Sequence, residues 1–94
     1  MAMDYEQKNR YENYMRDGDW HMSSAQTNLG YKYFSQARYH YWEAANCYKE
    51  AAYIARQAGD YAEYAASSKQ NEAEREFRDV QYKEEKWSKD HMEM

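Results

Sequence analysis

Apolar residues recur every seven positions through the middle of the chain. One series combines aromatic and small residues: Phe34, Tyr41, Tyr48, Ala55 and Ala62. A second series, three positions further on, consists of alanines: Ala37, Ala44, Ala51, Ala58 and Ala65. Further small or apolar residues flank both series: Ala45, Ala52, Cys47 and Ile54. This pattern predicts a helix with a broad apolar side, as expected for a helix buried within a bundle.

The segments on either side of this helix also have helical spacing. Residues 3–16 predict a first helix, whose Tyr11, Tyr14 and Met15 form a stripe that can cover the middle helix. Residues 60–90 predict a last helix with its own stripe: Ala66, Ala73, Val80 and Trp87. This stripe is longer than a short bundle can bury, so we expect the last helix to reach a second copy of the chain.

Three short segments predict breaks between helices. Residues 17–19, Asp-Gly-Asp, read as a turn whose second Asp caps the following helix. Residues 58–60, Ala-Gly-Asp, combine a helix-ending glycine with a helix-starting aspartate. A bend or tight turn is expected within 30–35, because an unbroken helix over 20–58 is long for a small domain. The prediction is one domain over 1–90, a small antiparallel bundle of three or four helices, followed by a disordered tail at 91–94.

Composition supports an all-α fold. Pro is absent, and Thr27, Ile54 and Val80 are the only β-branched residues, so a β-sheet is close to excluded. Large aliphatic residues are scarce, whereas there are twelve Tyr and three Trp among the 94 residues. Closely packed alanines with aromatic rings in the gaps can form an ordered core. The same rings are typical of binding surfaces.

Charge and cysteine content narrow the classes of function. The net charge of −4 argues against direct nucleic-acid binding, which needs clustered Lys and Arg. The single Cys47 precludes an intrachain disulfide. No run approaches the ~20 apolar residues of a membrane span, and the first ten residues are too polar for a signal peptide. We expect a cytoplasmic protein that does not bind membranes.

The candidates for chemistry are few. His40 and Glu43 share a helix face, but a metal site needs more ligands than this pair supplies. His21 and His91 each precede a methionine, as a copper–thioether site would require, although solvated side chains explain both equally. Cys47 lies beside the apolar side without a histidine within a helical turn, which indicates an inert thiol. We therefore predict no enzymatic activity, no metal and no cofactor.

One motif resembles a known repeat family. The spacing Phe34-x-x-Ala37-x-x-x-Tyr41-x-x-Ala44 resembles the second helix of a tetratricopeptide repeat, and the likeness covers about 20–66. Lys32 stands where this family usually has Gly, and no Pro closes the repeat. The resemblance implies binding of a peptide or protein partner rather than catalysis.

The aromatic residues outside the apolar series are the candidate partner-binding residues. They are Tyr39, Trp42 and Tyr53 on the middle helix, with Trp20, Tyr31 and Tyr33 near the expected bend. Two arrangements are open: a neighbouring helix covers the first three residues, or they form an exposed face of the kind that carries binding hot spots.

The predicted function is a non-enzymatic helical protein–protein interaction module that binds a protein partner or forms a homo-oligomer. The alternative is a small acidic inhibitor, of the kind phages use against host defence, that blocks a nucleic-acid-handling complex with its carboxylates. A third possibility is a nucleotide-binding protein in which aromatic rings stack a base and Lys32 or Arg38 meets a phosphate.

Overall fold

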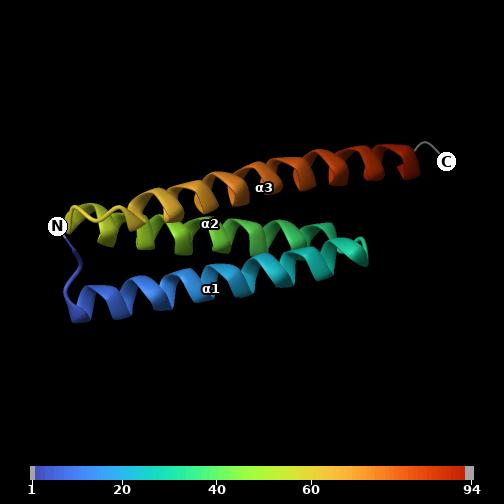
Figure 1. The fold of residues 1–94 in the computed structure, drawn as a ribbon. Coiled ribbons are helices and arrows are strands. Elements are labelled where there is room, and N and C mark those ends of the chain that lie inside the picture. Colours follow the sequence, from blue (N-terminus) through green and yellow to red (C-terminus); the bar gives the residue numbers. More distant parts are fainter. Residues whose placement is uncertain (1, 93–94) are drawn as a thin grey trace.

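The protein folds into three helices that lie side by side (Figure 1). The computed structural model describes residues 2–92, with side chains up to residue 90. Helix α1 spans Tyr5–Gly30, α2 spans Phe34–Gln57 and α3 spans Ala62–Met92, and no strand occurs within 2–92. The prediction of an all-α fold is confirmed. Residues 93 and 94, which belong to the predicted tail, lie outside the described part of the chain.

Helix α2 is the centre of the structure. Both α1 and α3 pack along its length, whereas α1 and α3 meet at few points. The result is elongated, with principal extents of 59 × 16 × 12 Å. The alanine series explains this arrangement, because Ala37, Ala44 and Ala51 are fully buried and their small side chains allow neighbouring helices to approach closely. The predicted contact ridge along α2 is therefore confirmed.

Helix α1 continues through the predicted break at residues 17–19, so that prediction is wrong. Gly18 is buried in the middle of α1, and a Cβ atom there would lie 2.5 Å from Cε1 of Tyr48. The glycine makes room for this ring, whose hydroxyl donates a hydrogen bond of 2.5 Å to Oδ1 of Asp19. Gly18 and Asp19 therefore serve packing between α1 and α2 instead of forming a turn.

The other two predicted breaks are confirmed. Residues 31–33 connect α1 to α2, and Lys32 adopts a positive φ of 62°. Gly59 connects α2 to α3 with a φ of 66°, the left-handed conformation that favours glycine. Asp60 follows, and its carboxylate accepts hydrogen bonds from the backbone N–H groups of Ala62 and Met3. These bonds lower the pKa of Asp60. The bond to Met3 also holds the start of the chain against the turn between α2 and α3.

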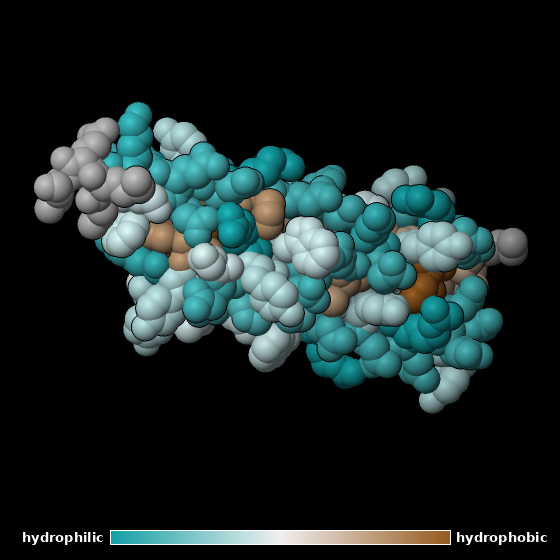
Figure 2. All heavy atoms as spheres, turned by 180° about the vertical axis from the view of Figure 1, so that it is seen from behind, coloured by the Kyte–Doolittle hydropathy of each residue, from teal (hydrophilic) through white to brown (hydrophobic). Residues whose placement is uncertain are grey.

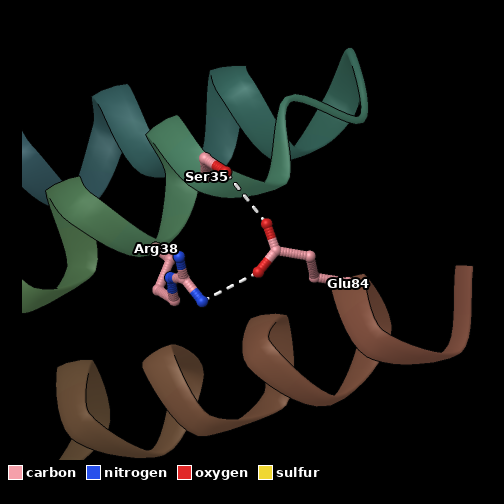
Figure 3. A network of polar contacts seen from close by, with 3 residues as sticks. All are labelled: Ser35, Arg38 and Glu84. Carbon is pink, nitrogen blue, oxygen red and sulfur yellow. Dashed lines mark hydrogen bonds and ion pairs between the residues drawn. The ribbon is translucent and has the colours of Figure 1, made fainter. Parts of the chain in front are cut away.

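The predicted stripe of α3 is buried within the single chain. Ala66, Ala73 and Val80 have no exposed surface, whereas Trp87 remains 42% exposed. Beyond Val80, Glu84 fastens α3 to the start of α2 (Figure 3). One carboxylate oxygen of Glu84 accepts a hydrogen bond of 2.9 Å from Ser35, and the other lies 2.8 Å from Nη1 of Arg38.

The predicted cover from α1 is also present. Tyr11, Tyr14 and Met15 are partly buried and pack against Ala51 and neighbouring alanines. The surface is largely hydrophilic on the side seen in Figure 2, where strongly apolar atoms show as separate spots. Among the described helices, none combines the length and the apolar character that crossing a membrane requires.

Candidate protein-binding face

The outward side of α2 carries three exposed aromatic rings. Tyr39, Trp42 and Tyr53 are 56%, 50% and 56% exposed. They point outward because the alanine ridge on the opposite side of α2 faces α1 and α3. Of the two arrangements that the sequence left open, the structure has the exposed one. We call this surface, made by Tyr39, Trp42, Asn46, Lys49 and Tyr53, the α2 face.

Two tyrosines of the α2 face lie at equal distances from Asn46. Tyr39 lies seven residues before Asn46 and Tyr53 seven residues after it. An interval of seven residues brings side chains to the same side of a helix. Trp42 and Lys49 lie between these three residues along α2. The face is therefore a line of aromatic and polar groups with Asn46 at its centre and one tyrosine on either side.

Two shallow hollows run along the α2 face where it borders α3. One has a volume of about 300 Å³ and is lined by Trp42, Ala45, Asn46, Glu74, Phe77 and Arg78. The other, of about 210 Å³, is lined by Lys49, Glu50, Ala52, Tyr53, Arg56 and Gln70. Both are large enough to receive single side chains of a partner. The α3 residues of these hollows were not predicted from the sequence. The signal for them was Phe77, which lies at helical spacing from Ala73 and Val80 of the α3 stripe.

The other predicted binding residues divide into two groups. Trp20, on α1, lies edge-on to His40 with ring centroids 5.6 Å apart, and His40 in turn lies edge-on to Tyr39 at 5.2 Å. The structure thus joins Trp20 to one end of the α2 face. Tyr31 and Tyr33 stack on each other at 5.7 Å in the loop between α1 and α2, where both are exposed.

The two histidines near this end form a direct contact between α1 and α2. Nδ1 of His21 lies 2.9 Å from Nδ1 of His40, so one ring donates a hydrogen bond and the other accepts it. Burial, and then the proximity of His40, lower the pKa of His21 below its usual 6.5, while Glu43 and Asp17 act in the opposite direction. If both imidazoles were protonated, two cations would lie in contact.

Within the described residues, no group of three or more His, Cys, Asp and Glu side chains could hold a metal ion. The side chains of His91 and Met92, considered for copper, lie outside the described part. Burial, followed by Asp17 and Glu43, raises the pKa of the Cys47 thiol. A thiol of this kind stays protonated at neutral pH and is a poor nucleophile.

The fold and the α2 face define a three-helix protein with an uncovered aromatic surface on its central helix. No family model, no curated protein and no solved structure matches the chain.

Proposed function

We propose that this protein is a non-catalytic protein-interaction module that self-associates through the α2 face. The observation that carries the proposal is the placement of the exposed Tyr39 and Tyr53 at equal distances from Asn46. Two copies related by a two-fold axis present the same patch to each other, so residue i meets residue j and residue j meets residue i. Two like rings at equal distances from a central residue meet this requirement.

The pairing of the two copies follows from the spacing. With the two α2 helices antiparallel and Asn46 opposite Asn46 of the partner subunit, Tyr39 faces Tyr53 of the partner subunit. Tyr53 then faces Tyr39 of the partner subunit in the same way, so two ring pairs lie on either side of the central amides. The two central amides can donate and accept hydrogen bonds between themselves. A central Asn in such a helix pair fixes the register.

The exposed rings supply the apolar area that association needs. Trp and Tyr are enriched at binding hot spots because they bury a large area at a low cost in conformational entropy. Charges around this face are mixed, because its two hollows are lined by Lys49, Arg56 and Arg78 together with Glu50 and Glu74. Mixed charge supports this proposal over the predicted acidic inhibitor, whose carboxylates would need to lie together without intervening cations.

Sedimentation equilibrium at several protein concentrations tests the self-association. We expect a monomer–dimer equilibrium that Asn46→Asp or Asn46→Lys alone weakens, because each places like charges opposite one another at the two-fold axis. An equal mixture of the two variants brings opposite charges together and should restore the dimer. Restoration depends on the proposed pairing, since no such compensation is expected if the two central residues do not meet.

Removal of aromatic rings gives a second test with a matched control. Tyr39→Ala/Tyr53→Ala should raise the dimer dissociation constant at least tenfold, as truncation of hot-spot residues typically costs more than ~1 kcal/mol each. Tyr61→Ala/Tyr64→Ala removes two rings that are even more exposed and stack on each other near the α2–α3 turn, and should leave the constant unchanged. A protein that stays monomeric at millimolar concentration would refute the proposal.

A further inference from the structure

A hollow at the end of the bundle is separate from the α2 face. It has a volume of about 370 Å³, within the range of small-molecule sites. Its lining comes from two distant parts of the sequence: Leu29, Lys32, Phe34, Lys83, Lys86, Trp87 and Asp90. The α1–α2 connection thus forms one wall and the last turns of α3 form the other.

The floor of this hollow is apolar. Leu29 and Phe34 are partly buried and pack against the core residues Ala25, Ala37, Tyr41 and Val80. The ring of Trp87 lies 6.1 Å from that of Phe34, centroid to centroid. The hollow is therefore an open end of the hydrophobic core, where Trp87 keeps exposed surface at its edge.

The rim of the hollow is cationic. Lys32 reaches it from the α1–α2 connection, and Lys83 and Lys86 reach it from successive positions on one side of α3. Among the described residues, Asp90 is the one acidic residue of this lining. The described lining therefore carries three ammonium groups and one carboxylate, in a protein whose net charge is −4. The anchoring of Glu84 on Ser35 and Arg38 holds the two walls in this position.

We infer that this hollow binds a small amphiphile, an apolar chain or ring that ends in an anionic head group. The apolar part would cover Leu29, Phe34 and Trp87. This contact would stabilise the complex, because it removes apolar surface from water. The anionic head would lie among the lysines of the rim. An uncharged apolar molecule would leave the cations unused, and a small hydrophilic anion would leave the floor uncovered.

Titration with octanoate, followed by two-dimensional ¹H–¹⁵N NMR, tests this inference. Each tryptophan gives one indole N–H signal, and Trp87→Phe identifies the signal of Trp87 by its loss. We expect octanoate to shift the Trp87 signal in a saturable way. Trp20 and Trp42 lie outside the hollow and serve as internal references. A shift of all three signals together would indicate non-specific binding and overturn the inference.

The role of the charges is tested with two octanoate analogues and one pair of variants. Octanol and octylammonium should bind at least tenfold more weakly than octanoate. Lys83→Gln/Lys86→Gln should weaken octanoate about tenfold, the combined effect of two exposed ion pairs near the upper end of their usual strength. Lys8→Gln/Arg10→Gln removes two charges at the start of α1 and should change nothing. Equal binding of octanol and octanoate would overturn the inference.

The outcome does not depend on the proposed function. Octanoate is monitored at the end of the bundle, whereas self-association is monitored by sedimentation and depends on the α2 face. A dimer that fails to bind octanoate refutes only the ligand site. A monomer in which octanoate shifts the Trp87 signal refutes only the self-association.

Discussion

Replacement of Gly18 by alanine tests the closest approach between α1 and α2. A Cβ at this position would lie 2.5 Å from one ring atom of Tyr48 and 2.8 Å from two others. The ring is fully buried and is held by its hydrogen bond to Asp19, so it cannot move aside without losing contacts. Two effects of opposite sign therefore compete, the cost of the overlap and the greater helix propensity of alanine.

The magnitudes decide the direction of the change. Overpacking of a core costs about 1–3 kcal/mol, and loss of a hydrogen bond to a charged group costs about 1.5–3 kcal/mol. The higher helix propensity of alanine stabilises the folded state by about 1 kcal/mol relative to glycine. We expect Gly18→Ala to lower the free energy of unfolding by about 2–4 kcal/mol, measured by urea denaturation. The melting temperature of a domain this small should fall by roughly 10 °C or more.

Two comparisons make the result specific. Gly30→Ala changes the other glycine of α1, where nothing lies within 4 Å of the added Cβ, and should change stability by less than about 0.5 kcal/mol. In a Tyr48→Leu background the steric conflict is removed, so Gly18→Ala should be neutral or stabilising. The reasoning is refuted if Gly18→Ala is as stable as the wild type, or if its effect is the same in the presence and absence of the Tyr48 ring.

Two further predictions concern contacts between helices. Glu84→Gln removes the ion pair with Arg38, and hydrogen exchange over 84–92 should become several-fold faster while that over 66–80 stays unchanged; equal rates in both proteins would contradict the anchoring role. The lowered pKa of His21 means that the unfolded chain binds a proton more readily, so stability should be lost as pH falls through about 6.5. His40→Asn should flatten this pH dependence in urea denaturation between pH 8 and 5, and an unchanged slope would contradict it.

The sequence predicted what depends on local pattern. Spacing by sevens located the buried side of α2, because a helix repeats its faces at a fixed interval. Gly59 was correctly predicted as the end of a helix, whereas the same prediction for Gly18, which is also followed by Asp, was wrong. The difference lies in Tyr48, which is thirty residues from Gly18 and becomes its neighbour only after α1 and α2 pair. The residues next to Gly18 in the sequence therefore do not identify Tyr48 as its neighbour.

The candidate sites show the same division. Tyr39, Trp42 and Tyr53 were identified as one face because they share a helix. The contact of Trp20 with His40 depends on how α1 and α2 align, and helical spacing within either element does not set that alignment. The end hollow combines Leu29 with Lys83 and Trp87, and only the register of α3 on α2 brings these residues together.

The alanine-rich core itself explains why so many aromatic rings lie at the surface. Alanines on both contact sides of α2 bring the helix axes close together, which leaves little volume for large side chains. Of the twelve tyrosines, Tyr41 and Tyr48 are fully buried, and Tyr48 fits because Gly18 lacks a side chain. Most of the remaining rings must therefore lie outside the core. A chain built in this way gains its helix packing from alanine, and the self-association proposed above would use the rings that alanine excludes.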